Sequence, residues 1–246
     1  MTTAIIPSYK RLFQAAEIDF EAGKILTEKN ICQPAIYHFQ QAYEKIVKAY
    51  YALKETVEIK TPEPDIYRKI TKLSHDTHAS TMQLLHDIAD IQKHGAEVAI
   101  DEIRKMQSQN PSSTIDPKAV PLLQKIITIS DGIHTALNNL TTSLNLDTNY
   151  VKNVRNYAQT VKDSYDTFQL SNTEVIVKEP EQAFLLIIGA TKALVPCFYK
   201  MEAVTRYPLE KFSYNNLDLL ANQKQACKQI AEIVETLFTV LKPYLI

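Results

Sequence analysis

The chain has 246 residues, a length that suits one large domain or one domain with a large insertion. Hydrophobic residues make up 45%, which is enough for a core and too many for a disordered chain. The formal net charge is −1, from 27 basic and 28 acidic residues. This balance excludes a general attraction of the whole surface for nucleic acid or anionic membranes, and leaves only a local basic patch open.

The number of glycines and the placement of prolines indicate the fold class. Only four glycines occur, which argues against a glycine-turned β architecture and against a phosphate-binding glycine loop. The eleven prolines fall mainly between segments in which apolar residues recur at helical spacing. The sequence therefore predicts an all-α protein.

In the first half of the chain, Ser8 is a plausible N-cap and Asn30 a helix breaker. Pro34 suits the first turn of the next helix, and a proline-containing linker follows at 61–64. We expect helices over residues 8–29, 34–56, 65–73 and 76–107.

In the second half, Asn110–Thr114 is typical of a loop, and Asp116 followed by proline is typical of an N-cap and first helical turn. The β-like run at 172–178 suits an extended linker better than a lone strand. We expect helices over residues 116–144, 147–165, 179–203 and 214–244.

Cysteine usage and targeting patterns indicate a cytoplasmic protein. Cys32, Cys197 and Cys227 form no C-x-x-C pair, and each lies in a helical apolar pattern, so we expect small buried side chains. The N-terminus lacks the features of a signal peptide. The most apolar stretch, 183–199, is too short to cross a bilayer, so no membrane association is expected.

Four motifs occur in an order and spacing that resemble the HEPN (higher eukaryotes and prokaryotes nucleotide-binding) family. Phe13–Leu26 is similar to the family's opening helix of small and acidic residues. Tyr37–Ala49 contains a glutamine-alanine-x-glutamate-lysine-x-x-lysine-alanine pattern. Ser74–Asp76 resembles a histidine-aspartate pair before the third helix, and Thr205–Pro208 matches a threonine-arginine-tyrosine-proline motif of one branch.

The resemblance implies a HEPN-like antiparallel, up-and-down helical bundle within a single all-α domain, 1–246. Its core would comprise residues 8–95 and 180–243, and about 100–175 would be an additional helical insertion. The branch with the last motif implies a homodimer that binds nucleotide or RNA phosphate rather than a nuclease. A regulatory protein without catalytic activity or cofactor is the function that the resemblance favours.

The candidate ligand-binding residues are Lys45, Lys48, Arg206 and Tyr207. The two lysines lie on the polar side of the second helix, where Glu44 and Lys48 have the favourable i,i+4 spacing. We expect the two lysines either to bind an anion or to belong to a solvated helix face with one ion pair. Arg206 precedes a tyrosine-proline turn. Its guanidinium group is expected either to bind phosphate or to pair with a group of the protein and fix the loop.

HEPN ribonucleases use an arginine followed four to six residues later by a histidine, and this pattern is missing where it would be expected. Arg155 has Thr160 at about that position, and no histidine follows Arg206. Arg68 and His75 fit the spacing when the six residues between them are counted, but they lie before the third helix. A metal-independent, toxin-like ribonuclease using Arg68 and His75 is therefore an alternative to the binding protein.

Histidines are concentrated between positions 75 and 94. His86, Asp90 and His94 share one helix face, but His86 and His94 lie too far apart along the helix to hold one ion. We expect a polar exposed stripe and no metal, with His86 and Asp90 plus a ligand from another helix as the weaker alternative. Another alternative function is a helical interaction module that binds a protein partner through the 100–175 insertion.

Overall fold

The computed structural model describes residues 6–72, 77–110, 116–146, 157–172, 180–206 and 224–246. Every element in these ranges is helical, which confirms the predicted all-α class. The elements are α1 (Ser8–Glu28), α2 (Cys32–Lys54), the π-helical turn η1 (Glu55–Ile59), α3 (Glu63–Thr71), α4 (Thr77–Gln109), α5 (Ala119–Leu146), α6 (Tyr157–Asn172), α7 (Pro180–Arg206) and α9 (Lys224–Leu245).

The expected helices agree with these bounds to within a few residues in α1 to α4. The expected starts at 147 and 214 and the expected linker at 172–178 lie largely outside the described residues. Helix α6 ends at Asn172 rather than near 165, because Phe168 continues its apolar stripe and is buried. The helix after Asp116 begins at Ala119, and the Asp116 carboxylate accepts a hydrogen bond from the backbone N–H of Lys118.

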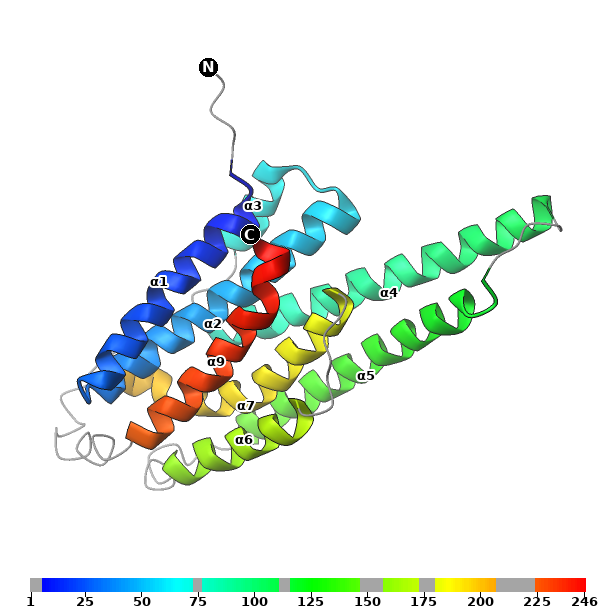
Figure 1. The fold of residues 1–246 in the computed structure, drawn as a ribbon. Coiled ribbons are helices and arrows are strands. Elements are labelled where there is room, and N and C mark those ends of the chain that lie inside the picture. The colour runs from blue at the N-terminus through cyan, green and yellow to red at the C-terminus, as the bar shows by residue number, and fades with distance from the viewer. Residues whose placement is uncertain (1–5, 73–76, 111–115, 147–156, 173–179, 207–223) are drawn as a thin grey trace, which may run out of the picture.

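Helix α2 lies at the centre of the bundle and contacts α1, α4, α7 and α9 (Figure 1). Its Ala42 and Ala49, which lie seven residues apart, are fully buried, as is Ala16 of α1. Small side chains at these positions let helix axes approach closely.

Aromatic rings join the two ends of the chain inside the bundle. The Phe238 ring of α9 lies 5.3 Å from the ring of Phe13 and 5.0 Å from that of Phe20, both on α1. Phe20 in turn lies 5.9 Å from the Phe39 ring of α2. Burial of such rings dominates core energetics, so α1, α2 and α9 form one packed unit.

The N-terminus of α1 is capped from a distant segment. Pro7 occupies the N-cap position, and Ser8 is the first helical residue, so the prediction of a Ser8 N-cap is wrong. The Glu63 carboxylate of α3 accepts hydrogen bonds from the backbone N–H and the hydroxyl of Ser8. A carboxylate at a helix N-terminus satisfies otherwise unpaired N–H groups and interacts favourably with the helix dipole.

The end of α2 is fixed by a buried carboxylate. The α-helix passes into η1 at Glu55, whose carboxylate accepts hydrogen bonds from Tyr51, Thr61 and Lys69, the last at 2.6 Å. Burial acts to raise the pKa of Glu55, but these hydrogen bonds outweigh it and lower the pKa below its usual value. Lys60 then takes a left-handed conformation (φ 58°) that ends the helix.

Helices α4 and α5 run antiparallel and project from the bundle as an arm (Figure 1). At 33 residues, α4 is about 50 Å long. Its first half is anchored by buried Leu85 and Ile88, whereas Met106 near the tip is 57% exposed. Leu122 of α5 is 61% exposed at the same end. Single exposed apolar side chains are common on protein surfaces, so the partner-binding role of the 100–175 insertion stays a prediction.

Candidate functional site

The polar side of the α1–α2 pair carries the first candidate site. The ammonium of Lys45 forms an ion pair with the Asp19 carboxylate of α1. His38 Nδ1 lies 3.0 Å from the other oxygen of the same carboxylate. Asp19 thus bridges two basic side chains of α2 that the sequence alone did not connect to it.

One turn further along α2, Lys48 forms the ion pair with Glu44 that its i,i+4 spacing predicted. Both side chains are largely shielded from solvent, with exposed fractions of 18% for Lys48 and 13% for Glu44. A lysine ammonium has three donors, so each lysine retains donors beyond the one directed at its carboxylate. A phosphate could accept from both, at the cost of weakening the two ion pairs. Lys45 and Lys48 are therefore brought to one surface, where each already has a carboxylate partner.

The other predicted site residues are only partly placed. Arg68 is exposed and lies 3.3 Å from the Asp65 carboxylate. Its expected partner His75 lies outside the described residues, as does Tyr207. Arg206 is the last residue of α7, and its side chain is likewise outside the described part of the structure. The Arg68–His75 pair and the Arg206–Tyr207 turn therefore keep the status of predictions.

Helices α4 and α5 are joined by a chain of polar contacts. His86 Nδ1 of α4 lies 2.6 Å from His134 Nδ1 of α5, and the rings stack with centroids 4.9 Å apart. His134 Nε2 lies 3.1 Å from the Asp90 carboxylate. A carboxylate accepts only, so Nε2 of His134 bears a proton, and in the neutral ring Nδ1 is then the acceptor. His86 consequently donates through its Nδ1.

This arrangement differs from a metal site. The sequence left open a metal site formed by His86, Asp90 and a third ligand from another helix. In the structure, His134 of α5 is the residue that lies against His86 and Asp90. However, the two Nδ1 atoms face each other at hydrogen-bonding distance, and Asp90 contacts the opposite edge of His134. In the part of the chain that the structure describes, no group of three or more His, Cys, Asp or Glu side chains could hold a metal ion.

The histidine pair makes stability depend on pH. Burial, followed by the neighbouring His134, lowers the pKa of His86, whereas Asp90 and Asp87 act in the opposite direction. The unfolded chain therefore binds a proton at His86 more readily than the folded chain does. The contribution of this histidine pair to the free energy of unfolding should be full above pH ~6.5 and should fall as the pH drops below it. Lys93 and Asp131, paired at 2.8 Å, are the charged groups beside this pair across the two helices.

We expect His86→Gln to flatten this dependence. Urea unfolding at pH 7.5 and 5.5 should show a smaller loss of stability at the lower pH than the original chain shows. The difference should stay below about 1 kcal/mol, because both rings are partly solvated. His94→Gln, on the exposed side of α4, serves as the control. An equal effect of both substitutions would contradict the assignment to the His86–His134 contact.

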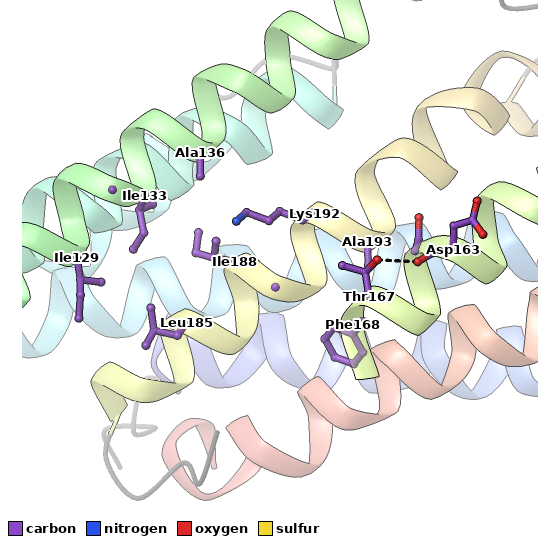
Figure 2. Close-up of a pocket in the computed structure, with 13 residues that line it drawn as sticks. Ile129, Ile133, Ala136, Asp163, Thr167, Phe168, Leu185, Ile188, Lys192 and Ala193 are labelled. Carbon is purple, nitrogen blue, oxygen red and sulfur yellow. Dashed lines mark hydrogen bonds between the residues drawn. The ribbon is translucent and has the colours of Figure 1, made fainter. Parts of the chain in front are cut away.

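A pocket of about 640 Å³ lies between α5, α6 and α7 (Figure 2). Its lining is mostly apolar and comes from all three helices: Ile129, Ile133, Phe168, Leu185 and Ile188. Lys192 of α7 and Asp163 of α6 contribute its charged groups. No motif in the sequence indicates this pocket. The one available signal is that Gly132 and Gly189, two of only four glycines, lie in two long apolar helices, α5 and α7.

A smaller groove of about 380 Å³ lies between α1 and α9. Its rim combines lysines and glutamates in equal number: Lys24, Lys224, Lys228, Glu28, Glu232 and Glu235. The mixed charges give the groove no net preference for an anion or a cation.

The three cysteines are buried and free, as predicted. The Cys227 thiol of α9 lies 3.5 Å from the backbone carbonyl of Cys32, to which it donates. Burial raises the pKa of Cys227 far above its usual value. A buried thiol that stays protonated is a poor nucleophile, so Cys227 serves packing.

The comparisons with known proteins support the family resemblance in one part of the chain. Residues 9–107 match the family model of the HEPN domain. Searches of curated proteins and of solved structures found no match. The matched segment contains α2 and α3 and nearly all of α1 and α4, and thus both Lys45 and Lys48. No helix among the described residues is both long and apolar enough to cross a membrane.

Proposed function

We propose that the chain is a HEPN-like regulatory protein that binds nucleotide or RNA phosphate, acts as a homodimer and has no catalytic activity. The observation that carries this proposal is the HEPN match over 9–107 together with the position of Lys45 and Lys48 on one surface of α2 within it. Arg206 and Tyr207 complete the proposed ligand-binding set.

The proposed binding step exchanges carboxylate partners for phosphate oxygens. Lys45 and Lys48 lie three residues apart on a helix, so their ammonium groups emerge on the same side. Asp19 and Glu44 hold both side chains in place before the ligand arrives. Because these carboxylates also repel an incoming anion, binding should be weak and should fall further as salt rises.

Replacing Lys45 or Lys48 with methionine should weaken binding of ATP, GTP or a short RNA about tenfold, the effect of losing one charge-assisted hydrogen bond. Calorimetric titration at low and moderate salt measures this. Lys105→Met, near the C-terminal end of α4, removes the same charge from an exposed position and should leave affinity unchanged. Far-UV circular dichroism checks that helicity is kept.

Two outcomes would contradict the proposal. Equal weakening by Lys45→Met and Lys105→Met would reduce the effect to net charge. Absence of saturable binding to all three ligands would leave the HEPN match as a statement about fold alone. Arg206→Ala extends the same titration to the second part of the proposed site.

A further inference from the structure

We propose that the pocket between α5, α6 and α7 binds a small amphipathic monoanion, an organic carboxylate with an aliphatic body. All three walls of this pocket lie outside the matched segment, and the pocket is distinct from the α1–α2 surface proposed for phosphate. The proposal therefore does not depend on nucleotide binding.

The volume and lining define the body of the ligand. At about 640 Å³, the pocket falls in the range of small-molecule sites. Its walls are mainly isoleucine, leucine and phenylalanine side chains, and Leu185 is 38% exposed. Covering such surface with an aliphatic chain removes apolar area from water, whereas a sugar or a polar base would find few hydrogen-bonding groups there.

Lys192 defines the charge of the ligand. Figure 2 shows its side chain extending from α7 into the space between α7 and α5, beside Ile188. Within the described residues, no hydrogen bond or ion pair engages its ammonium group. Lys192 is exposed, so its ammonium group stays at the solvated rim of the pocket, where it can pair with the anionic head of a ligand whose apolar body lies against the pocket wall.

Asp163 limits that charge to a single negative unit. It lines the same pocket from α6, where its carboxylate accepts a hydrogen bond from Gln159 at 2.7 Å. One lysine and one carboxylate leave the rim without net positive charge, so it offers a nucleotide polyphosphate no net attraction. The arrangement thus selects a monoanion.

Gly132 is the position at which a substitution tests this pocket. It lies on α5 at the pocket wall, and a Cβ added there would meet no atom within 4 Å. Gly95 on α4 is equally open but lies outside the pocket. Gly132→Leu therefore adds a large apolar side chain at the pocket wall without a clash at its Cβ, and Gly95→Leu adds the same side chain elsewhere.

The experiment uses the full chain and decanoate as the probe, below the concentration at which it forms micelles. Calorimetric titration should show saturable binding of decanoate and at least about tenfold weaker binding of neutral decanol, the loss expected for one charge-assisted contact. Lys192→Met, which keeps an unbranched side chain, should weaken decanoate by a similar factor and leave decanol unchanged. Lys192→Arg should retain binding.

Gly132→Leu should abolish binding of decanoate, and Gly95→Leu should leave it intact. Equal binding to both variants, or decanol binding as tightly as decanoate, would overturn the proposal. ATP competing with decanoate for this pocket would overturn the monoanion assignment. Weaker ATP binding in Lys45→Met with decanoate binding unchanged would show that the two sites are separate.

Discussion

Gly23→Ala is expected to destabilise the protein by about 1–2 kcal/mol, although alanine is the better helix former. A Cβ at this position of α1 would lie 2.5 Å from Cε1 and 2.7 Å from Cδ1 of the Phe39 ring. Phe39 is fully buried and packs against the ring of Phe20, so it cannot rotate away. Overpacking costs about 1–3 kcal/mol and outweighs a helix-propensity gain of about 1 kcal/mol. Urea unfolding measures the change.

Gly95→Ala supplies the matched control, because a Cβ there meets no atom within 4 Å. It should stabilise the chain by about 0.5–1 kcal/mol, the difference between glycine and alanine in a helix. A second check introduces Gly23→Ala into a Phe39→Leu variant. There the smaller side chain at position 39 should reduce the destabilisation that Gly23→Ala causes. If Gly23→Ala were as stabilising as Gly95→Ala, the close approach of α1 and α2 at Gly23 would be refuted.

The helices could be predicted because their determinants are local. Periodic apolar residues, proline and Asn30 placed the ends of α1 within a residue, and Asn30 indeed takes a positive φ of 61°. The prediction of Ser8 as N-cap failed because the carboxylate that accepts a hydrogen bond from the Ser8 backbone N–H belongs to Glu63, 55 residues further along the chain. An interaction of that sequence separation leaves no mark in a local pattern.

The same distinction explains which parts of the candidate sites were foreseen. The Glu44–Lys48 ion pair follows from i,i+4 spacing and was predicted. The pairing of Lys45 with Asp19 and of His86 with His134 joins different helices, and the packing of those helices decides it. The pocket depends on how far α5 stands from α7, which composition and periodicity do not encode.

The packing ties the HEPN-matched segment to helices beyond it. Phe238 of α9 completes the aromatic cluster of α1, and α2 contacts α7 as well as α9. Helix α4 also runs without a break through position 100, where we expected the insertion to begin, and continues to Gln109 beside α5. We therefore propose that residues 180–206 and 224–246 belong to the same folding unit as 9–107.

A buried hydrogen bond between α2 and α7 provides the strongest test of this unit. The Tyr43 hydroxyl lies 2.6 Å from Thr191 Oγ1, which also donates to the backbone carbonyl of Ile187 at 2.6 Å. Thr191 thus donates to Ile187 and accepts from Tyr43. Burial raises the pKa of Tyr43 far above its usual value, in spite of the opposing effect of Thr191, so the phenol stays protonated as the donor.

Thr191→Val should cost about 1–3 kcal/mol, because it leaves the buried Tyr43 hydroxyl without an acceptor. Tyr43→Phe should cost less, about 0.5–1.5 kcal/mol, since Thr191 keeps its bond to Ile187. The double variant should be more stable than Thr191→Val alone, because no unpaired hydroxyl remains. Denaturant unfolding of the three variants measures this order. Equal costs for the two single variants, summing in the double, would mean that α7 does not hold Tyr43 in a dry contact and that the matched segment folds independently of it.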